Sequence, residues 1–401
     1  MGDQQQGPQD FPIDGTVAPG FDPVREAFAR NFADGYEVGA SLAVEYQGEQ
    51  VVDLWGGFAD TVASIPWSRD TLVNVYSTTK GIAAAAFACL IDDGTIRYDE
   101  PVAEYWPELR AARNGLTVGQ LLAHQGGLAG LQRELTVPDL FDWEQMISWL
   151  QEAEPLWEPG TAAGYHAITW GYLPGELCRR VAHASLGEVL ARRVCEPLAA
   201  DFHIGLAPEH FDRVAAVIGP NRAKRRPPPS GAARKPRATG GFEMPPLYRI
   251  ALENPVIRPF ADVGTANWRQ ADIAAANGHG NGRSIARIYG ALSNAGKTGK
   301  PSQSIWSGSA AEQARREEPV EGKDLVLGRH IRRGRGFFLN AEGMYGPGPN
   351  AFGHSGAGGS LGFADPDKGL GFGYAMNQMQ MGLDGDGRTT RLIKALYSCL
   401  D

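Results

Sequence analysis

The strongest constraint on the fold of this chain is an uninterrupted apolar run of mostly small side chains, from Ile82 to Ile91. Alanine and leucine favour the helix, and the run ends at Asp92-Asp93-Gly94, a sequence typical of a helix stop. Directly before the run stands the sequence Val75-Tyr76-Ser77-Thr78-Thr79-Lys80-Gly81. The pattern predicts a buried helix with Ser77 at its N-terminal end.

Ser77 and Lys80 lie three residues apart, so on a helix they share one face, with Cβ atoms about 5–6 Å apart. A serine becomes a good nucleophile when a base takes its proton, and a lysine can be that base when burial or nearby cations lower its pKa. The free N–H groups of a helix N-terminus also stabilise an oxyanion. On this motif alone an alternative stays open, in which Ser77 caps the helix and Lys80 is a surface charge, because Ser-x-x-Lys occurs by chance about once in a chain this long.

The composition excludes several classes of protein. The 401 residues carry a net charge of −8, with 43% hydrophobic and 21% charged residues, which is typical of a globular protein and argues against a general nucleic-acid binder. The start of the chain lacks a signal-peptide pattern and no apolar run is long enough to span a membrane, so we expect a cytoplasmic protein. The four cysteines are scattered, and we expect reduced thiols. The histidines show no metal-ligand spacing, so we expect neither metal nor cofactor.

Hydrophobic periodicity and turn residues predict the elements along the chain. Helices are expected over residues 22–32, 116–124, 143–152, 169–182, 186–195, 283–294 and 388–399. Strands are expected over residues 40–46, 51–57, 330–339, 351–363 and 370–376. Residues 1–20, rich in Gly, Pro and Gln, are expected to form a flexible tail.

Strands at both ends of the chain with helices between them predict an α+β protein. We expect a discontinuous α/β lobe over residues 21–110 and 270–401, a helical lobe over 111–269, and a site between the lobes. The helical lobe includes the basic, proline-rich segment 221–240, interpreted as a solvated loop; an acidic partner or nucleic acid is the weaker alternative. The oligomeric state has no signal in the sequence.

Tyr165 is the best candidate for a second proton-transfer group beside Ser77. It stands in a glycine-rich turn just before the helix expected at residue 169, and loops of this kind carry functional side chains. The alternative is a tyrosine that packs its ring and hydrogen-bonds its hydroxyl.

Several motifs in order resemble the serine β-lactamase superfamily, from about residue 22 to the C-terminus. The group most similar to this chain is the family VIII carboxylesterases, relatives of class C β-lactamases and DD-peptidases. The motifs are Ser77-Thr78-Thr79-Lys80, Leu90-Ile91-Asp92-Asp93-Gly94-Thr95-Ile96, Leu121-Leu122-Ala123-His124-Gln125-Gly126-Gly127-Leu128, Pro159-Gly160-Thr161 with Tyr165-His166-Ala167, and Gly171-Tyr172-Leu173-Pro174-Gly175-Glu176.

The resemblance implies a class C β-lactamase-like antiparallel sheet flanked by helices, with an inserted, mainly helical lobe. It also implies that Ser77 is the nucleophile, Lys80 the base and Tyr165 a phenol that works with it. In β-lactamases an asparagine stands two residues after this tyrosine, where this chain has Ala167. The replacement removes an amide that orients the substrate, so we expect weak binding of β-lactams.

The family's third motif, Lys-Thr-Gly or a His/Trp variant, has two candidates here. Lys297-Thr298-Gly299 matches literally but follows a helix, whereas His354-Ser355-Gly356 lies in a glycine-rich strand near the C-terminus. We favour His354-Ser355-Gly356 as the substrate-binding segment because its context fits the family. The backbone N–H groups of Ser77 and Ala357 are then expected to form the oxyanion hole.

Two other motif matches fail on their context. Gly353-His354-Ser355-Gly356-Ala357 resembles a nucleophile elbow but leads into no helix, and Gly296-Lys297-Thr298 lacks the spacing of a P-loop. We therefore expect a serine hydrolase that cleaves short-chain carboxylic esters through an acyl-enzyme on Ser77. The alternatives are a β-lactamase, peptidase or acyltransferase with the same site, or a catalytically silent binding protein.

Overall fold

Strands from both ends of the chain build one antiparallel sheet of 8 strands, in the order β1-β3-β2-β10-β9-β8-β7 with β4 paired to β3. The computed structural model describes residues 11–219, 244–259, 261–297, 305–380 and 386–400. The sheet strands are β1 (Ile13–Val17), β2 (Gly39–Tyr46), β3 (Glu49–Asp60), β4 (Ile65–Pro66), β7 (Phe338–Leu339), β8 (Phe352–Ser355), β9 (Leu361–Asp365) and β10 (Leu370–Met376), and a separate pair is formed by β5 (Val73–Asn74) and β6 (His279–Gly280).

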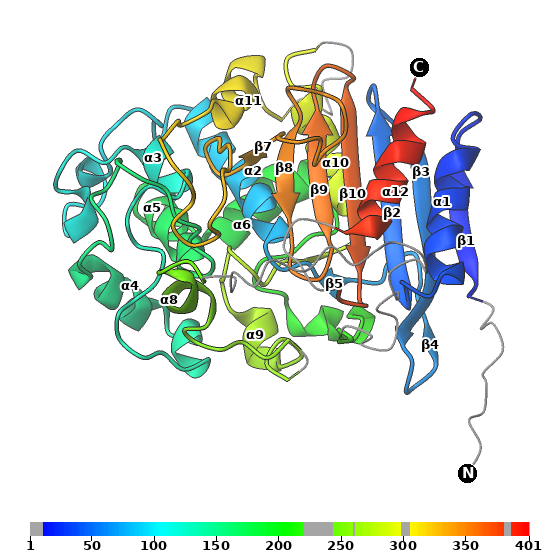
Figure 1. Cartoon of the computed structure of the whole chain (residues 1–401), viewed down its shortest axis with the longest axis horizontal. Coiled ribbons are helices and arrows are strands. Elements are labelled where there is room, and N and C mark those ends of the chain that lie inside the picture. The colour runs from blue at the N-terminus through cyan, green and yellow to red at the C-terminus, as the bar shows by residue number, and fades with distance from the viewer. Residues whose placement is uncertain (1–10, 220–243, 260, 298–304, 381–385, 401) are drawn as a thin grey trace, which may run out of the picture.

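The sheet lies at one end of the molecule, and most helices from the middle of the chain gather at the other (Figure 1). The predicted α+β class is confirmed. The helices are α1 (Asp22–Ala33), α2 (Thr78–Asp92), α3 (Val118–Leu122), α4 (Trp143–Glu152), α5 (Tyr172–Ala182), α6 (Leu186–Leu190), α7 (Glu196–Leu198), α8 (Tyr248–Leu252), α9 (Ala266–Gln270), α10 (Gly282–Ser293), α11 (Gly308–Arg315) and α12 (Gly387–Tyr397). The lobe boundaries near residues 110 and 270 stay a prediction.

The sequence of β10 explains how helices cover both faces of the sheet. Successive side chains of a strand point to opposite faces. Gly371 and Gly373 face α10, which lies so near that a Cβ on Gly371 would come within 2.2 Å of the Gly290 nitrogen. Phe372 and Tyr374 point to the other face, into the core formed with α1 and α12. The glycines let α10 approach closely, and the aromatic side chains fill the wider space beneath α1 and α12.

Helix α2 is the buried helix that the apolar run predicts. All its residues from Thr78 to Ile91 are buried, and it packs against α6, α11 and β8. Because alanine side chains are short, neighbouring elements come close to its axis on every side. The helix therefore carries Ser77 at its N-terminal end into the junction between the sheet and the helices of the chain's middle.

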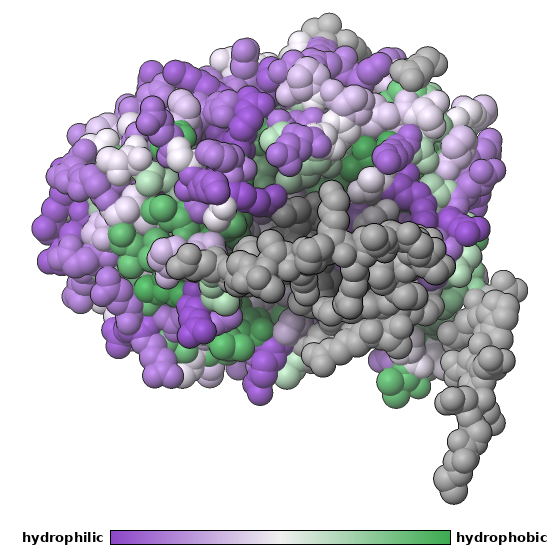
Figure 2. Space-filling model, in the orientation of Figure 1, coloured by the Kyte–Doolittle hydropathy of each residue, from purple (hydrophilic) through white to green (hydrophobic). Residues whose placement is uncertain are grey.

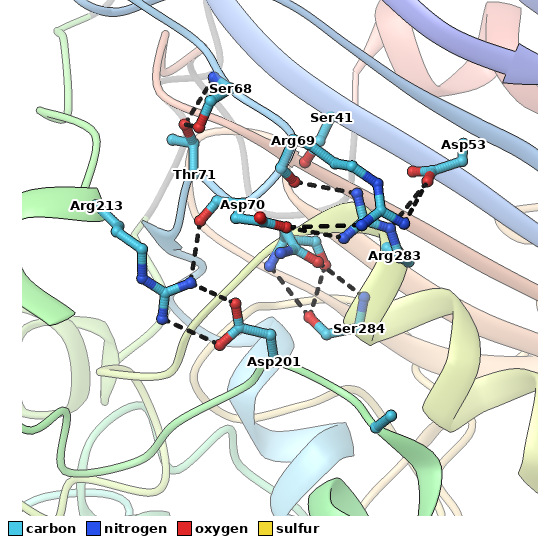
Figure 3. Close-up of polar contacts among 12 residues, drawn as sticks. Ser41, Asp53, Ser68, Arg69, Asp70, Thr71, Asp201, Arg213, Arg283 and Ser284 are labelled. Carbon is cyan, nitrogen blue, oxygen red and sulfur yellow. Dashed lines mark hydrogen bonds and ion pairs between the residues drawn. The ribbon is translucent and has the colours of Figure 1, made fainter.

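A network of charged side chains anchors the segment just before β5 (Figure 3). Arg283 of α10 donates to Asp53 of β3 at 2.9 Å and contacts Asp70 at 3.5 Å. Arg213 donates to the backbone carbonyl of Asp70 at 3.2 Å and pairs with Asp201 at 2.7 Å. The network connects this segment to the sheet and to the middle of the chain.

The expected flexible tail is wrong for part of residues 1–20. Residues 13–17 form strand β1, which pairs with β3 from Ile13↔Gly56 to Val17↔Val52. Ile13 and Val17 pack against the core that includes α1, so alternating apolar side chains hold the segment in place in spite of its neighbouring glycines. Residues 1–10 and the basic segment 221–240 lie outside the described residues.

Two expected strands differ from the structure. The strand predicted over residues 330–339 is limited to β7, because the arginines before it are drawn into ion pairs: Arg332 with Glu317, Arg333 with Asp324 and Arg335 with Glu318. The strand predicted over residues 351–363 is divided into β8 and β9 by a tight turn with glycines at 356, 358 and 359.

The coloured part of the surface in Figure 2 is mainly hydrophilic. Val62 and Ile65, at the β3–β4 hairpin, are large apolar side chains that stay exposed. Within the described ranges, no helix combines the length and the apolar character that a membrane span requires.

Candidate active site

The chain turns sharply just before Ser77. Tyr76 has a φ of +46°, in the left-handed region that bulky residues seldom adopt. Ser77 follows at the N-cap position of α2 and is half-buried, and its side chain makes no capping hydrogen bond. The hydroxyl contacts two other side chains instead, so the interpretation of Ser77 as a helix cap is wrong.

Lys80 points from the first turn of α2 to the Ser77 hydroxyl. Its Nζ lies 3.3 Å from Ser77 Oγ and donates to the backbone carbonyls of Ala167 at 2.8 Å and Ala275 at 2.9 Å. Lys80 is fully buried, and this burial lowers its pKa well below the ordinary value of 10.5. The alternative of a surface charge is therefore wrong, and the structure favours a neutral amine.

Tyr165 reaches the same hydroxyl from the other side. Its Oη donates to Ser77 Oγ at 2.7 Å, and the ring lies with its centroid 4.9 Å from Lys80 Nζ. The side chain is buried, and Tyr165 stands in the loop before α5, ahead of the 3-10 turn Thr169–Gly171. The structure thus brings together the three residues that the sequence separates by up to 88 positions.

The turn between β8 and β9 lies directly against the segment before Ser77. Ser360 Oγ donates to the Val75 carbonyl at 2.8 Å and lies 3.0 Å from Thr78 Oγ1. A Cβ on Gly356 would come within 2.2 Å of the Val75 carbonyl oxygen. This turn places Ala357 beside the start of α2. In the described part of the chain, the backbone N–H groups of Ser77 and Ala357 have no backbone acceptor.

His354 lies in β8, which packs against α2, but it is buried behind the site. Its ring stacks on Phe338 at 4.4 Å, and Nδ1 lies 2.7 Å from the Ser355 carbonyl. Burial lowers its pKa to about 3, so His354 is a neutral side chain. Ser355 is buried as well. The rival motif is only partly described: Lys297 is exposed and contacts the Pro366 carbonyl, and Thr298 and Gly299 lie outside the described residues.

Three further groups to which the sequence assigns no role lie close to Tyr165. His124 follows α3 with a φ of +66°, and its ring lies 5.1 Å from the Tyr165 ring. The buried pair Asp324 and Arg333 lies behind the Tyr165 main chain. His124 belongs to a motif that the sequence shows, but Asp324 and Arg333 stand in a loop with no recognisable pattern. Across the described ranges, no group of three or more His, Cys, Asp or Glu side chains is arranged to hold a metal ion.

The chain is similar to known proteins over most of its length. The profile of the beta-lactamase family matches residues 25–397. The esterase/beta-lactamase LipL of Mycobacterium tuberculosis is 35% identical over 374 residues, which are 91% of this chain and 83% of LipL.

Two solved structures share nearly the whole fold. A family VIII carboxylesterase superposes with a TM-score of 0.88 at 44% identity, and covers 97% of this chain and 100% of its own. A penicillin-binding protein homologue from Caulobacter crescentus superposes with a TM-score of 0.84 at 40% identity, with the same coverage of 97% and 100%. The chain therefore belongs to the beta-lactamase family, as its sequence motifs predict, and the resemblance to family VIII carboxylesterases is confirmed.

Proposed function

We propose that this protein is a serine carboxylesterase that hydrolyses short-chain esters through an acyl-enzyme on Ser77. One observation carries the proposal: Ser77 Oγ lies within hydrogen-bond reach of both the Tyr165 phenol and the buried Lys80 amine. A nucleophile that contacts a base, with the base oriented by further groups, is the arrangement that activates a serine. The similar family VIII carboxylesterase and LipL, named as an esterase, support ester substrates.

The contacts of Lys80 fit the role of a base. A neutral amine has two N–H groups and one lone pair. The carbonyls of Ala167 and Ala275 take the two N–H groups, which leaves the lone pair directed to Ser77 Oγ. We infer that the Ser77 proton passes to the Lys80–Tyr165 pair, and that the two groups titrate together because they share the same hydroxyl.

The remaining steps follow from this geometry. Ser77 Oγ bonds to the acyl carbon while its proton moves to the Lys80–Tyr165 pair, and the oxyanion is held by the N–H groups of Ser77 and Ala357. The C–O bond of the ester then breaks, and the Tyr165 phenol returns the proton to the departing alcohol. Water, deprotonated by the same pair, attacks the acyl-enzyme; the acid is released and Ser77 recovers its proton. The segment His354-Ser355-Gly356 is the proposed substrate-binding segment on the β8 side; because the His354 and Ser355 side chains are buried, its backbone would border the acyl group.

β-Lactam hydrolysis is the second candidate, because LipL is named as both an esterase and a beta-lactamase. The residue at position 167 argues against it. Ala167 contributes a backbone carbonyl to Lys80 and a methyl side chain, with no amide to orient a β-lactam. Chains with this catalytic arrangement can also pass the acyl group to an alcohol in place of water, which would make an acyltransferase.

Substrate turnover separates these candidates. We expect the purified protein to release p-nitrophenol from p-nitrophenyl acetate and butyrate, and to open a chromogenic cephalosporin far more slowly. Faster opening of the cephalosporin would support the β-lactamase alternative. A protein inert to both substrates and unlabelled by a serine-directed phosphonate would be a binding protein.

The pH dependence of ester hydrolysis should report the lowered pKa of Lys80. The amine accepts a proton only when it is neutral, so kcat/KM should rise with pH through the pKa of the Lys80–Tyr165 pair. Because burial lowers the pKa of Lys80, the plateau should be reached well below pH 10.5. Initial rates across the pH range would show this, and a rate that is still rising at pH 10.5 would contradict it.

A substitution at Gly356 tests the proposed oxyanion turn. The Cβ of Gly356→Ala would come within 2.2 Å of both Ser360 Oγ and the Val75 carbonyl oxygen, so the turn must shift and carry the Ala357 N–H with it. Loss of one oxyanion donor lowers kcat by about 10²- to 10³-fold. Gly264→Ala is the matched control, because a Cβ at Gly264 has no neighbour within 4 Å. Equal kcat in the two variants would exclude the turn from the oxyanion hole.

A further inference from the structure

The main chain around Tyr165 is held by hydrogen bonds from three consecutive N–H groups. Gly164 N donates to the His124 carbonyl at 3.2 Å, and His166 N donates to His124 Nδ1 at 3.0 Å. Between them, Tyr165 N donates to Asp324 Oδ1 at 3.3 Å. Two of the three acceptors are therefore side chains, and the one that serves Tyr165 itself is a carboxylate.

Hydrogen bonds within its own turn hold the Asp324 carboxylate beside the Tyr165 main chain. Its Oδ1 also accepts from the backbone nitrogens of Val326 at 2.8 Å and Leu327 at 2.6 Å, which fixes the carboxylate in its own turn. Leu325 N donates to the Ala163 carbonyl at 3.0 Å, so this turn is bonded to the Tyr165 loop at two points. A buried carboxylate is costly without a partner of opposite charge, and Arg333 donates to its Oδ2.

Both charges of the pair lie inside the protein. The Asp324 side chain is 0% exposed and that of Arg333 is 3% exposed. The guanidinium lies 5.5 Å from the ring of Phe338, which is also near the rings of Tyr165 at 6.0 Å and His354 at 4.4 Å. The pair therefore lies one ring away from the phenol that contacts Ser77, where water screens charge poorly.

We propose that the buried Asp324–Arg333 pair positions Tyr165: the carboxylate fixes the main chain that carries the phenol, and the guanidinium balances the charge of that carboxylate. The inference rests on the proposed function. In it, Asp324 and Arg333 act through Tyr165 and touch no substrate.

The surrounding groups define an electrostatic signature for this role. In the described part of the chain, the titratable groups around the Lys80–Tyr165 pair include His124 after α3, His166 next to Tyr165, His354 on β8 and the Asp324–Arg333 pair, with Arg329 as a second cation near Arg333. Burial holds the pKa of each histidine well below 6.5, so the three are neutral. Removing the Asp324 charge leaves the Arg333 cation unbalanced, since an arginine does not lose its proton. A free cation disfavours a protonated Lys80 and favours a phenolate at Tyr165.

Asp324→Asn is the direct test, in the full-length protein with p-nitrophenyl acetate. We expect kcat to fall by about 10- to 100-fold with little change in KM, because the phenol is displaced while the substrate contacts remain. The rising limb of the pH profile should also move to lower pH. Arg333→Lys, which keeps a cation beside Asp324, should leave this limb at its wild-type position. A purely structural role would move neither the limb nor the ratio of kcat to KM in this way.

A double variant without either charge and a control at another buried ion pair complete the test. If Asp324→Asn folds poorly, the double variant Asp324→Asn/Arg333→Met removes both charges; it should lose kcat and keep the limb in place. Asp53→Asn is the matched control, because it removes one charge from the buried pair with Arg283 shown in Figure 3. It should leave kcat and the pH profile unchanged.

The possible results distinguish the positioning role of Asp324 from the proposed esterase function. Wild-type kcat and an unmoved limb in Asp324→Asn would overturn the positioning role alone. The same losses in Asp53→Asn would also overturn it, because they would reflect general destabilisation. A wild-type protein that hydrolyses no ester would contradict the proposed function, and the positioning role with it.

Discussion

Ser77→Ala is expected to lower kcat/KM for p-nitrophenyl esters by about 10⁴- to 10⁶-fold, the range seen when the nucleophile of a serine hydrolase is removed. The Oγ atom forms the bond to the acyl group, so without it no acyl-enzyme can form at position 77. Initial rates at high enzyme concentration, with a second purification to exclude contaminating esterases, would measure the residual activity.

The stability of the same variant provides the control. Replacing a serine that caps a helix with alanine lowers the free energy of unfolding by about 1 kcal/mol. The Ser77 side chain makes no capping hydrogen bond, so Ser77→Ala should unfold at nearly the wild-type denaturant concentration. Lost activity with unchanged stability would identify a nucleophile. Lost stability with retained turnover would return Ser77 to the role of a helix cap.

Lys80→Met is expected to lower kcat/KM by about 10²- to 10⁴-fold, the usual contribution of a general base. Methionine fills a similar volume but accepts no proton, so Ser77 is left with the phenol alone. The variant also leaves the buried carbonyls of Ala167 and Ala275 without a donor, at a cost of about 1–3 kcal/mol for each group. Part of this cost is offset because a buried amine no longer has to be desolvated.

Lys297→Met is the matched control for this change. It removes a lysine of the same type from an exposed position, and Lys297 begins the literal Lys-Thr-Gly sequence. We expect full activity and stability from it. If Lys297→Met loses activity while Lys80→Met retains it, the choice of His354-Ser355-Gly356 over Lys297-Thr298-Gly299 would be wrong, and so would the assignment of the base.

The parts of the fold that could be predicted are those in which a local pattern settles the structure. The apolar run after Lys80 allows only a buried helix, and the three-residue spacing then brings Lys80 to Ser77. The alternation of glycine with aromatic residues in β10 predicts a strand with two different faces. In each case a short stretch of sequence contains the whole physical reason.

Other parts depend on contacts made by residues far away in the sequence. The segment at Ile13–Val17 has weak local preferences and becomes a strand because the edge of β3 is available to it. The arginines before Phe338 alternate with apolar and small residues as in a strand, but distant carboxylates pull them into a loop. For the same reason, the position of Asp324 and Arg333 behind Tyr165 could not be predicted. It depends on the hydrogen bond between the loop at residue 324 and Ala163.

The carbonyl partners of Lys80 could not be predicted either. Backbone oxygens carry no sequence signal, so the contribution of Ala167 and Ala275 is visible only in the folded chain. Position 167 illustrates this. From the sequence one sees only that alanine stands where β-lactamases have an asparagine amide, whereas the structure shows that the Ala167 carbonyl accepts from Lys80.

The most direct test of the central claim is to locate the residue that a serine-directed phosphonate modifies. The protein is inactivated with a p-nitrophenyl phosphonate, digested and analysed by peptide mass spectrometry. We predict one phosphonyl group per chain, on Ser77, with loss of esterase activity in proportion to labelling. A label on another residue, or full esterase activity in protein labelled at Ser77, would contradict a nucleophile activated by Lys80 and Tyr165.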